Sequence, residues 1–222
     1  GKPGGRRERR GGEAGGGGSV LGFGCYGGCA ELASVQGVVA NKMAEGMDLG
    51  LGGVAGPTAV VYEAVKRSGL REGQNVAVMG AGPIGLLMAL LAKISGANHV
   101  YIVDVSEVRL NKAKELGIEN TINPNEADVN DVIRKDLPNG VDITFECAGV
   151  QATFNTALKV TKRTGVLQVV ALFGKDVSMN MTDDVIMQGI NITTTLCYNN
   201  SFPAVLGIIN NHPETFRKII TK

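Results

Sequence analysis

The chain has 222 residues, and 22 Lys and Arg against 21 Asp and Glu give a formal net charge of +1. This length allows one full α/β domain and part of a second. The balanced charge gives the chain as a whole no attraction to polyanions, so neither nucleic acid nor a membrane is expected as a partner. The longest apolar run, residues 83–92, is too short to span a membrane and ends at Lys93.

The amino-terminal residues 1–18 combine arginines with glycines, including four consecutive glycines at 15–18. This stretch has no apolar periodicity and cannot bury enough surface to offset the entropy of ordering it. We predict a disordered tail; an RNA-binding arm is less favoured, because no aromatic residue lies among the arginines to stack on bases. No apolar core follows the basic start, as it would in a secretory signal. The four cysteines have no regular spacing, so a cytoplasmic location is expected.

Residues 19–57 carry weaker signals. The stretch 19–39, SVLGFGCYGGCAELASVQGVV, is typical of a glycine-punctuated β-type segment. A helix is then predicted from about Thr58 to Ser68. Thr58 can cap the first turn of this helix, and Gly69 can follow its last turn in the left-handed conformation.

From Asn75 onward, short β-branched runs alternate with longer segments of helical spacing. The predicted strands are 75–79, 99–103, 120–123, 141–145, 166–173 and 191–196. The predicted helices between them are 84–95, 107–116, 126–136 and 151–162. This alternation implies right-handed crossovers and a parallel sheet covered on both faces. The sequence therefore predicts the α/β class, with a doubly wound parallel sheet (Rossmann fold) over residues 58–222.

Three glycines follow the first of these strands in the motif GAGPIG. Gly80 permits the tight turn, Gly82 lets the backbone approach a pyrophosphate, and Gly85 lets the next helix lie close to the sheet. Pro83 suits a first helical turn, where its missing N–H is no loss. The start of that helix offers N–H groups and a partial positive charge to a phosphate.

Asp104 lies 24 positions after Gly80, at the end of the second predicted strand. A carboxylate there can accept both ribose hydroxyls of a dinucleotide and would repel a 2′-phosphate. NAD is therefore favoured over NADP, although Arg109 is close enough in the sequence to keep NADP open. Two other interpretations stay open: a plain glycine turn with an aspartate that caps the next helix, and a methyltransferase that binds S-adenosylmethionine.

Residues 73–117, together with the segment GVDITFECAGV at 140–150, resemble the medium-chain dehydrogenase superfamily, in its zinc-dependent polyol and butanediol branch. The segment GPTAVVYEAVKRSGL at 56–70 resembles the helix by which that family enters its cofactor domain. The resemblance implies an NAD-dependent oxidoreductase that transfers a hydride between a secondary alcohol or polyol and the nicotinamide. It also implies that residues 19–57 are the remnant of a β-rich, GroES-like catalytic domain.

The resemblance further implies cofactor contacts at the ends of several strands. Pro83 and Ile84 would touch the pyrophosphate, and Asp104 and Arg109 would bind the adenosine half. Cys147 and Ala148 would lie beside the nicotinamide ribose, Val170 and Leu172 would offer backbone groups to the carboxamide, and Tyr198 would close over the cofactor. The complete predicted set is Gly80, Gly82, Pro83, Ile84, Gly85, Asp104, Arg109, Cys147, Ala148, Val170, Leu172 and Tyr198.

Zinc is expected from the resemblance, but the family's ligands are not found in this chain. The family holds the metal with a cysteine, a His–Glu pair and a glutamate just before the proline of the entry helix. Neither His99 nor His212 is followed by glutamate, and Gly56 precedes Pro57. A non-catalytic NAD-binding module therefore stays open as an alternative function. By the same resemblance, the last predicted strand (191–196) is expected to pair across a homo-oligomer.

Two shorter motifs are not predicted to be sites. Tyr62 and Lys66 have the YxxxK spacing of short-chain dehydrogenases, but they precede the glycines instead of following them. Cys25 and Cys29 have no partner pair at zinc-ligand spacing.

Overall fold

The computed structural model describes residues 27–28, 30–35, 37 and 40–220. The chain divides into two compact units, Gly1–Lys42 and Met43–Lys222. The described residues of the first unit contain no strand. The prediction of a β-type segment at 19–39 is therefore wrong for the residues of this range that the structure describes. A strand needs a neighbour to pair its backbone groups, and the described part of this unit offers none. The predicted tail (1–18) and both Cys25 and Cys29 lie outside the described residues.

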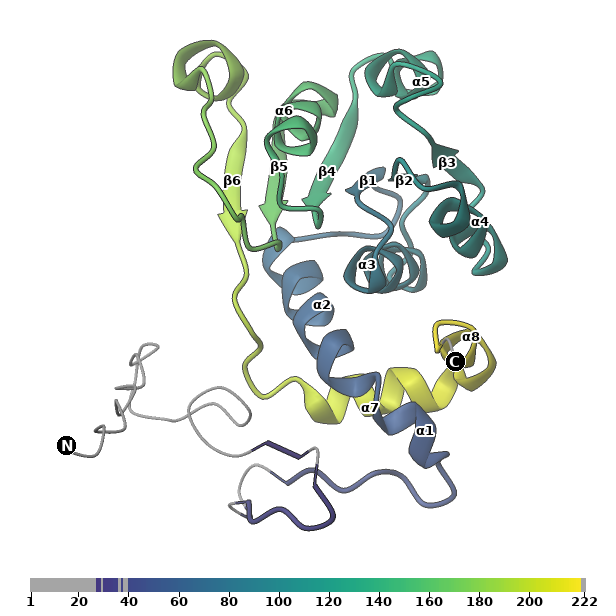
Figure 1. The fold of residues 1–222 in the computed structure, drawn as a ribbon. Coiled ribbons are helices and arrows are strands. Elements are labelled where there is room, and N and C mark those ends of the chain that lie inside the picture. Colours follow the sequence, from purple (N-terminus) through teal and green to yellow (C-terminus); the bar gives the residue numbers. More distant parts are fainter. Residues whose placement is uncertain (1–26, 29, 36, 38–39, 221–222) are drawn as a thin grey trace, which may run out of the picture. The chain divides into compact units, whose positions relative to one another are not determined.

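Six parallel strands form one sheet in the second unit, in the order β3-β2-β1-β4-β5-β6 (Figure 1). The strands are β1 (Val76–Met79), β2 (Val100–Val103), β3 (Asn120–Ile122), β4 (Val141–Glu146), β5 (Thr161–Val169) and β6 (Asn191–Thr194). The strand order runs outward from β1 in one direction and from β4 in the other. The sheet is therefore doubly wound, which confirms the predicted fold class, and its switch point lies between β1 and β4.

Side chains of the central strands alternate between the two faces of the sheet. Val76 and Val78 belong to the core on one face, whereas Ala77 and Met79 belong to the core on the other. All four residues are fully buried. Because helices cover both faces, β1 has no polar side, and its apolar run is continuous.

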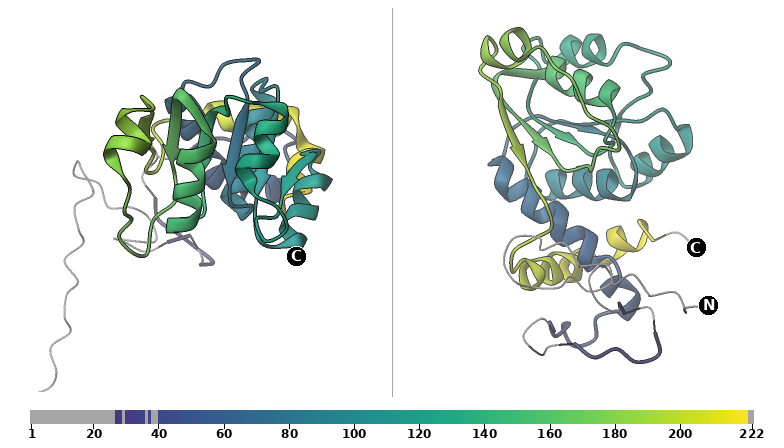
Figure 2. Two further views of the ribbon diagram at one scale, coloured as in Figure 1. Left: turned by 90° about the horizontal axis from the view of Figure 1, so that it is seen from above. Right: turned by 60° about the vertical axis from the view of Figure 1, so that its left-hand side comes forward.

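Helices lie on both sides of the sheet (Figure 2). They are α1 (Leu49–Gly52), α2 (Ala55–Ser68), α3 (Pro83–Ile94), α4 (Glu107–Glu115), α5 (Val129–Asp136), α6 (Gln151–Val160), the π-helix η2 (Met181–Ile186), α7 (Phe202–Asn211) and α8 (Pro213–Arg217). Helices α2, α3, α4, α7 and α8 contribute to the core on the Val78 face, and α5 and α6 to the core on the Met79 face. None of the helices in the described residues has the length and apolar character needed to cross a membrane.

Helix α2 begins three residues before the predicted Thr58 and ends at Ser68 as predicted. Thr58 is not the N-cap: it lies within the helix, where its hydroxyl donates to the Val54 carbonyl at 2.6 Å. Pro57 lies in the first turn of α2. Its missing N–H is no loss there, because the N–H groups of a first helical turn have no intrahelical acceptor. Gly69 follows the last turn with φ +71°, which confirms the predicted helix end.

The boundary between α6 and β5 also differs from the prediction. Helix α6 ends at Val160 and β5 starts at Thr161, although helical spacing in the sequence continues to residue 162. The buried Thr161 hydroxyl lies 2.8 Å from the Thr144 hydroxyl on β4, and Thr161 pairs with Val141. Pairing with the neighbouring strand thus replaces the last helical turn. Helices α7 and α8 lie beyond the last predicted element.

Candidate functional site

The loop after β1 turns sharply and brings helix α3 close to the sheet. Gly80 has φ +98°, and its N–H donates to the Val103 carbonyl at 2.7 Å. A Cβ added to Gly85 would lie 1.8 Å from the Gly80 carbonyl oxygen, whereas a Cβ on Gly82 would meet no atom within 4 Å. The backbone is therefore closely packed at Gly85 and open at Gly82.

The open side of this loop faces the amino terminus of α3. Gly82 is the N-cap residue and Pro83 is the first helical residue. No side chain of the described residues caps this end, and no acidic residue lies in the first turn. Since the first N–H groups of a helix have no intrahelical acceptor, Ile84 and Gly85 present theirs at a partially positive helix end. This arrangement suits a bound anion.

Asp104 follows β2 and lies beside the same loop, with only 8% of its surface exposed. Its Oδ2 accepts the Ala81 N–H at 2.8 Å, and its Oδ1 accepts the Ser106 N–H at 2.9 Å. Arg109 Nη1 lies 3.4 Å from Oδ2. A carboxylate has about four lone-pair directions, so Asp104 can still accept hydroxyl donors while the loop holds it in place.

The turn after β4 lies against the same loop on the other side of β1. The Cys147 N–H donates to the Met79 carbonyl at 2.9 Å. A Cβ added to Gly80 would lie 3.1 Å from the Cβ of Ala148. Burial, and then the neighbouring charge of Glu146, raise the pKa of the Cys147 thiol well above its ordinary value, so this cysteine is a neutral side chain at physiological pH.

The segment after β5 lies next to this turn. The N–H groups of Val170 and Ala171 donate to the Glu146 carbonyl at 2.9 and 3.1 Å. A Cβ added to Gly149 would lie 2.8 Å from the Leu172 carbonyl oxygen. The Leu172 side chain itself is 83% exposed. The segments 147–149 and 170–172, which contain the predicted residues Cys147, Ala148, Val170 and Leu172, are thus brought together at the carboxyl ends of β4 and β5.

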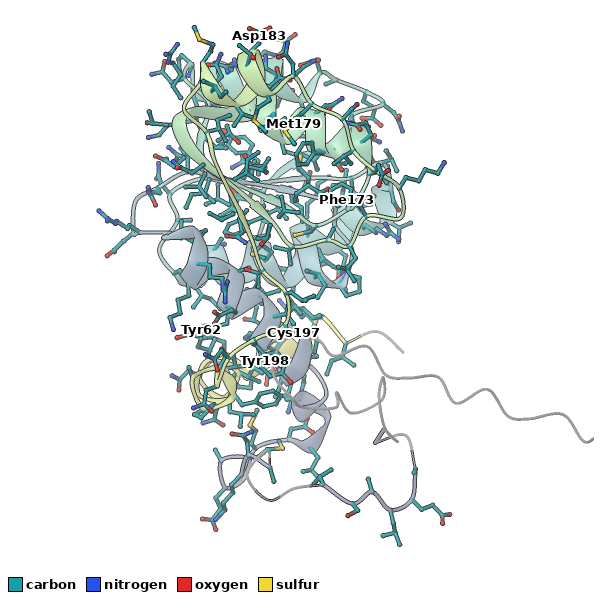
Figure 3. All side chains as sticks on the ribbon, turned by 90° about the vertical axis from the view of Figure 1, so that its left-hand side faces the viewer. Tyr62, Phe173, Met179, Asp183, Cys197 and Tyr198 are labelled. Atoms are coloured by element: carbon teal, nitrogen blue, oxygen red, sulfur yellow. The ribbon has the colours of Figure 1, made fainter. Side chains whose placement is uncertain are left out.

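Tyr198 is placed differently from these segments. It lies between β6 and α7, where its ring contacts the Phe202 ring at a centroid distance of 5.2 Å. In the view of Figure 3, Tyr198 is well separated from Phe173, which follows Leu172. The ring partner of Tyr198 is therefore on α7. Within the described residues, no hydrogen bond or ring contact joins Tyr198 to the glycine-rich loop.

Sequence reasoning did not select Glu146, the last residue of β4. Its side chain is completely buried, and its carboxylate accepts hydrogen bonds from the turn that follows. The available signal was an acidic residue at the end of an apolar strand, directly before the segment CAG.

Two cavities lie away from these strand ends. One has a volume of about 660 Å³ and lies at the opposite end of β5. Its lining includes Thr161, Lys162, Gln188 and, from α5, Arg134. The other, of about 390 Å³, lies between α6 and the segment that leads to η2. Neither is lined by the glycine-rich loop or by Asp104, so the candidate site is defined by its backbone geometry.

Metal-binding groups do not gather within the described part of the chain. No three His, Cys, Asp or Glu side chains there are close enough to hold an ion. The described residues therefore do not fit the family's zinc.

Together, the strand order, the uncapped start of α3 and the acid after β2 define the class of this protein: a doubly wound α/β fold with the loop geometry of dinucleotide-binding domains. Residues 83–211 match the zinc-binding dehydrogenase family. The chain belongs to that family.

Individual relatives show how much of the family architecture is present. The chain is 32% identical over 197 residues to (R,R)-butanediol dehydrogenase of Bacillus subtilis, which covers 88% of this chain and 56% of that protein. It is 31% identical over 185 residues to sorbitol dehydrogenase of Arabidopsis thaliana, covering 81% and 50%. The crystal structure of 2R,3R-butanediol dehydrogenase from Bacillus subtilis superposes with a TM-score of 0.73 at 31% identity, over 77% of this chain and 49% of that one. The chain thus spans about half the length of these relatives.

Proposed function

We propose that this chain binds NAD across the carboxyl ends of β2, β1 and β4. The observation that carries the proposal is the hydrogen bond between Asp104 and Ala81, which fixes a carboxylate beside the uncapped start of α3. The N–H groups of Ile84 and Gly85 would bind the pyrophosphate, with Gly82 leaving the space for it. The carboxylate of Asp104 would accept the hydroxyls of the adenosine ribose.

The same carboxylate supports NAD over NADP. A 2′-phosphate on the ribose would approach the negative charge of Asp104, which costs free energy in a site with little exposure to solvent. Among the described residues, the one cation paired with Asp104 is Arg109. Because this guanidinium is already bound to the carboxylate, it is less available to pair with a phosphate.

We place the nicotinamide half over the ends of β4 and β5. Cys147 and Ala148 would lie beside its ribose, and the backbone groups of Val170 and Leu172 would meet the carboxamide. Tyr198 would have to move from its contact with Phe202 to close over the cofactor.

The named relatives support oxidation of a small secondary alcohol or polyol as the activity. When bound, NAD supplies the hydride acceptor, and this chain's residues would bind and orient its two halves. The alternative is a module that binds NAD without turnover. The chain spans about half of these relatives, and from them we propose both the activity and the substrate class.

Titration of the purified chain with NADH, followed by nicotinamide fluorescence, tests the binding. Saturation by the wild type and a weaker response from Asp104→Ala are expected; no saturation with either protein would contradict the proposal. Assays with NAD and either 2,3-butanediol or sorbitol, with metal analysis of the same sample, separate the two activities. Steady NADH production supports the dehydrogenase, and NADH binding without turnover supports the module.

We also propose that β6 pairs with β6 of a second copy. In the part of the chain that the structure describes, β6 is an edge of the sheet and is paired only with β5. Next to it, η2 and the residues around it expose Met181, Ile186 and Met187. Unpaired edge backbone beside apolar side chains favours association. Size-exclusion chromatography with light scattering should give twice the mass of one chain; a single-chain mass at all concentrations would contradict this assembly.

A further inference from the structure

Glu146 is a buried carboxylate that the proposed binding of NAD leaves without a role. It is the last residue of β4 and has no exposed surface. In the described part of the chain it forms no ion pair with a lysine, arginine or histidine. An unpaired buried carboxylate is costly unless hydrogen-bond donors surround it. The groups that donate hydrogen bonds to the Glu146 carboxylate therefore indicate its structural role.

The donors come from the turn after β4 and from the helix that follows it. Glu146 Oε1 accepts the N–H groups of Ala148 and Gly149 at 3.2 and 3.0 Å, and Oε2 lies 3.1 Å from the Gly149 nitrogen. The Thr153 hydroxyl on α6 donates to Oε1 at 2.7 Å. The side chain thus holds the backbone of residues 147–149 in a single turn.

The backbone of Glu146 holds a second segment. Its carbonyl accepts the N–H groups of both Val170 and Ala171, at 2.9 and 3.1 Å. These two bonds turn the chain out of β5 after Val169. One residue therefore connects the turn 147–149 with the segment 170–172.

The topology places both segments under one half of a dinucleotide. Asp104 and the glycine-rich loop lie at the ends of β2 and β1, where the adenosine and the pyrophosphate are proposed to bind. A dinucleotide crosses the sheet at its switch point, here between β1 and β4. Its other half must then lie over the ends of β4 and β5, which are the ends that Glu146 organises.

We propose that Glu146 is a positioning residue for the nicotinamide half of the cofactor. This inference rests on the proposed binding of NAD. Glu146 acts through the backbone of residues 147–149, since it is buried beneath that turn. In the described residues its carboxylate accepts hydrogen bonds from Ala148, Gly149 and Thr153 and none from the glycine-rich loop, so we expect a much smaller effect on the binding of the adenosine half.

Glu146→Gln tests this proposal at nearly constant side-chain volume. If the amide oxygen takes the place of Oε1, the NH₂ group faces the Gly149 N–H that Oε2 now accepts, and two donors oppose each other. The turn must then shift. We expect the affinity for NADH to fall about tenfold, the effect of losing one hydrogen bond to a charged group. The affinity for ADP, which lacks both the nicotinamide and its ribose, should change less than about twofold.

Calorimetric titration of wild type, Glu146→Gln and Asp104→Ala with both ligands separates the possible results. Selective loss of NADH affinity in Glu146→Gln, with both ligands weakened in Asp104→Ala, supports the proposal. Equal effects of Glu146→Gln on both ligands, or no effect on either, overturn it. If the wild type binds neither ligand, the proposed binding of NAD itself fails, and this inference fails with it.

A second variant decides the question if Glu146→Gln does not fold. Thr153→Val removes the hydroxyl donor to Oε1. It should weaken the binding of NADH selectively, as Glu146→Gln does, but by a smaller factor. Thr156→Val is its matched control on α6, because the Thr156 hydroxyl donates to the Ala152 carbonyl at 2.9 Å and not to Glu146. Equal NADH affinities of these two threonine variants would overturn the proposal.

Discussion

The carboxylate of Asp104 accepts a hydrogen bond from the N–H of Ala81 at 2.8 Å, across 23 residues of sequence. The bond joins the end of β2 to the loop after β1. Ala81 is almost completely buried, so this N–H depends on Asp104 for its partner. The residue proposed to bind the ribose is therefore also part of the framework that shapes the phosphate loop.

Asp104→Ala should reduce both affinity and stability. Loss of the charged acceptor for the ribose hydroxyls is expected to weaken NADH binding about tenfold to a hundredfold. Loss of the partner for the Ala81 N–H should lower the free energy of unfolding by about 1–3 kcal/mol. Fluorescence titration and urea unfolding measure the two effects. Unchanged NADH affinity in a folded variant would remove Asp104 from the site.

Gly82→Ala and Gly85→Ala should separate binding from folding. The Cβ of Gly82→Ala meets no protein atom within 4 Å, and its φ of −70° suits alanine. This variant should lose about 1 kcal/mol or less, as expected for alanine at an N-cap, while its methyl group weakens NADH binding by occupying the space proposed for the pyrophosphate.

Gly85→Ala should have a different effect, because its Cβ would lie 1.8 Å from the Gly80 carbonyl oxygen. Overpacking of this kind costs about 1–3 kcal/mol or more. Thermal unfolding of both variants measures the difference. A lower melting temperature for Gly82→Ala than for Gly85→Ala would contradict this explanation of the loop.

Asp142 should make the stability of the domain depend on pH in the acid range. Burial alone would raise its pKa, but hydrogen bonds from Lys162 and from the Asn75 N–H outweigh burial and leave the pKa below its ordinary value of 3.8. Its contribution is therefore complete above pH 3.8 and is lost as the pH falls through the lower pKa of the folded state.

Asp142→Asn tests this contribution. We expect the variant to lose about 1–2 kcal/mol at neutral pH, with a difference from the wild type that shrinks as the pH falls below about 4. Urea unfolding of both proteins from neutral to acidic pH measures it. A constant difference throughout this range would show that ionised Asp142 does not stabilise the fold.

Tyr101 should make the stability of the domain depend on pH in the alkaline range. Burial, together with its hydrogen bond to Asp136, raises the pKa of Tyr101 to about 12. Because the pKa is raised, its contribution to stability is complete below about pH 10 and is lost as the pH rises toward 12. Tyr101→Phe should cost about 1 kcal/mol at neutral pH, and its deficit should shrink above pH 10. Absorbance of the phenolate checks the pKa directly, and a titration at the ordinary tyrosine value would contradict it.

Some features of the candidate site could be predicted from local sequence. The glycine spacing after β1 and the acid at the end of β2 are signals confined to a few neighbouring residues, and the structure has Gly80 at positive φ and Asp104 beside the loop. Thr58 was assigned to the wrong helical position because α2 starts after Val54, a residue without a capping side chain, which no capping pattern selects. Only the packing of α2 decides that the helix starts at Ala55.

By itself, the sequence determined the alternation of strands and helices, the turn at Gly80 and the acid after β2, because these depend on backbone preferences and on periodic burial over short stretches. Only the tertiary structure decided that Thr161 joins β5, that Tyr198 contacts Phe202, and that Glu146 binds both the turn after β4 and the start of the segment after β5. These contacts join residues that are brought together by strand pairing and helix packing, and no pattern within a single segment encodes which partner a buried donor or acceptor will meet.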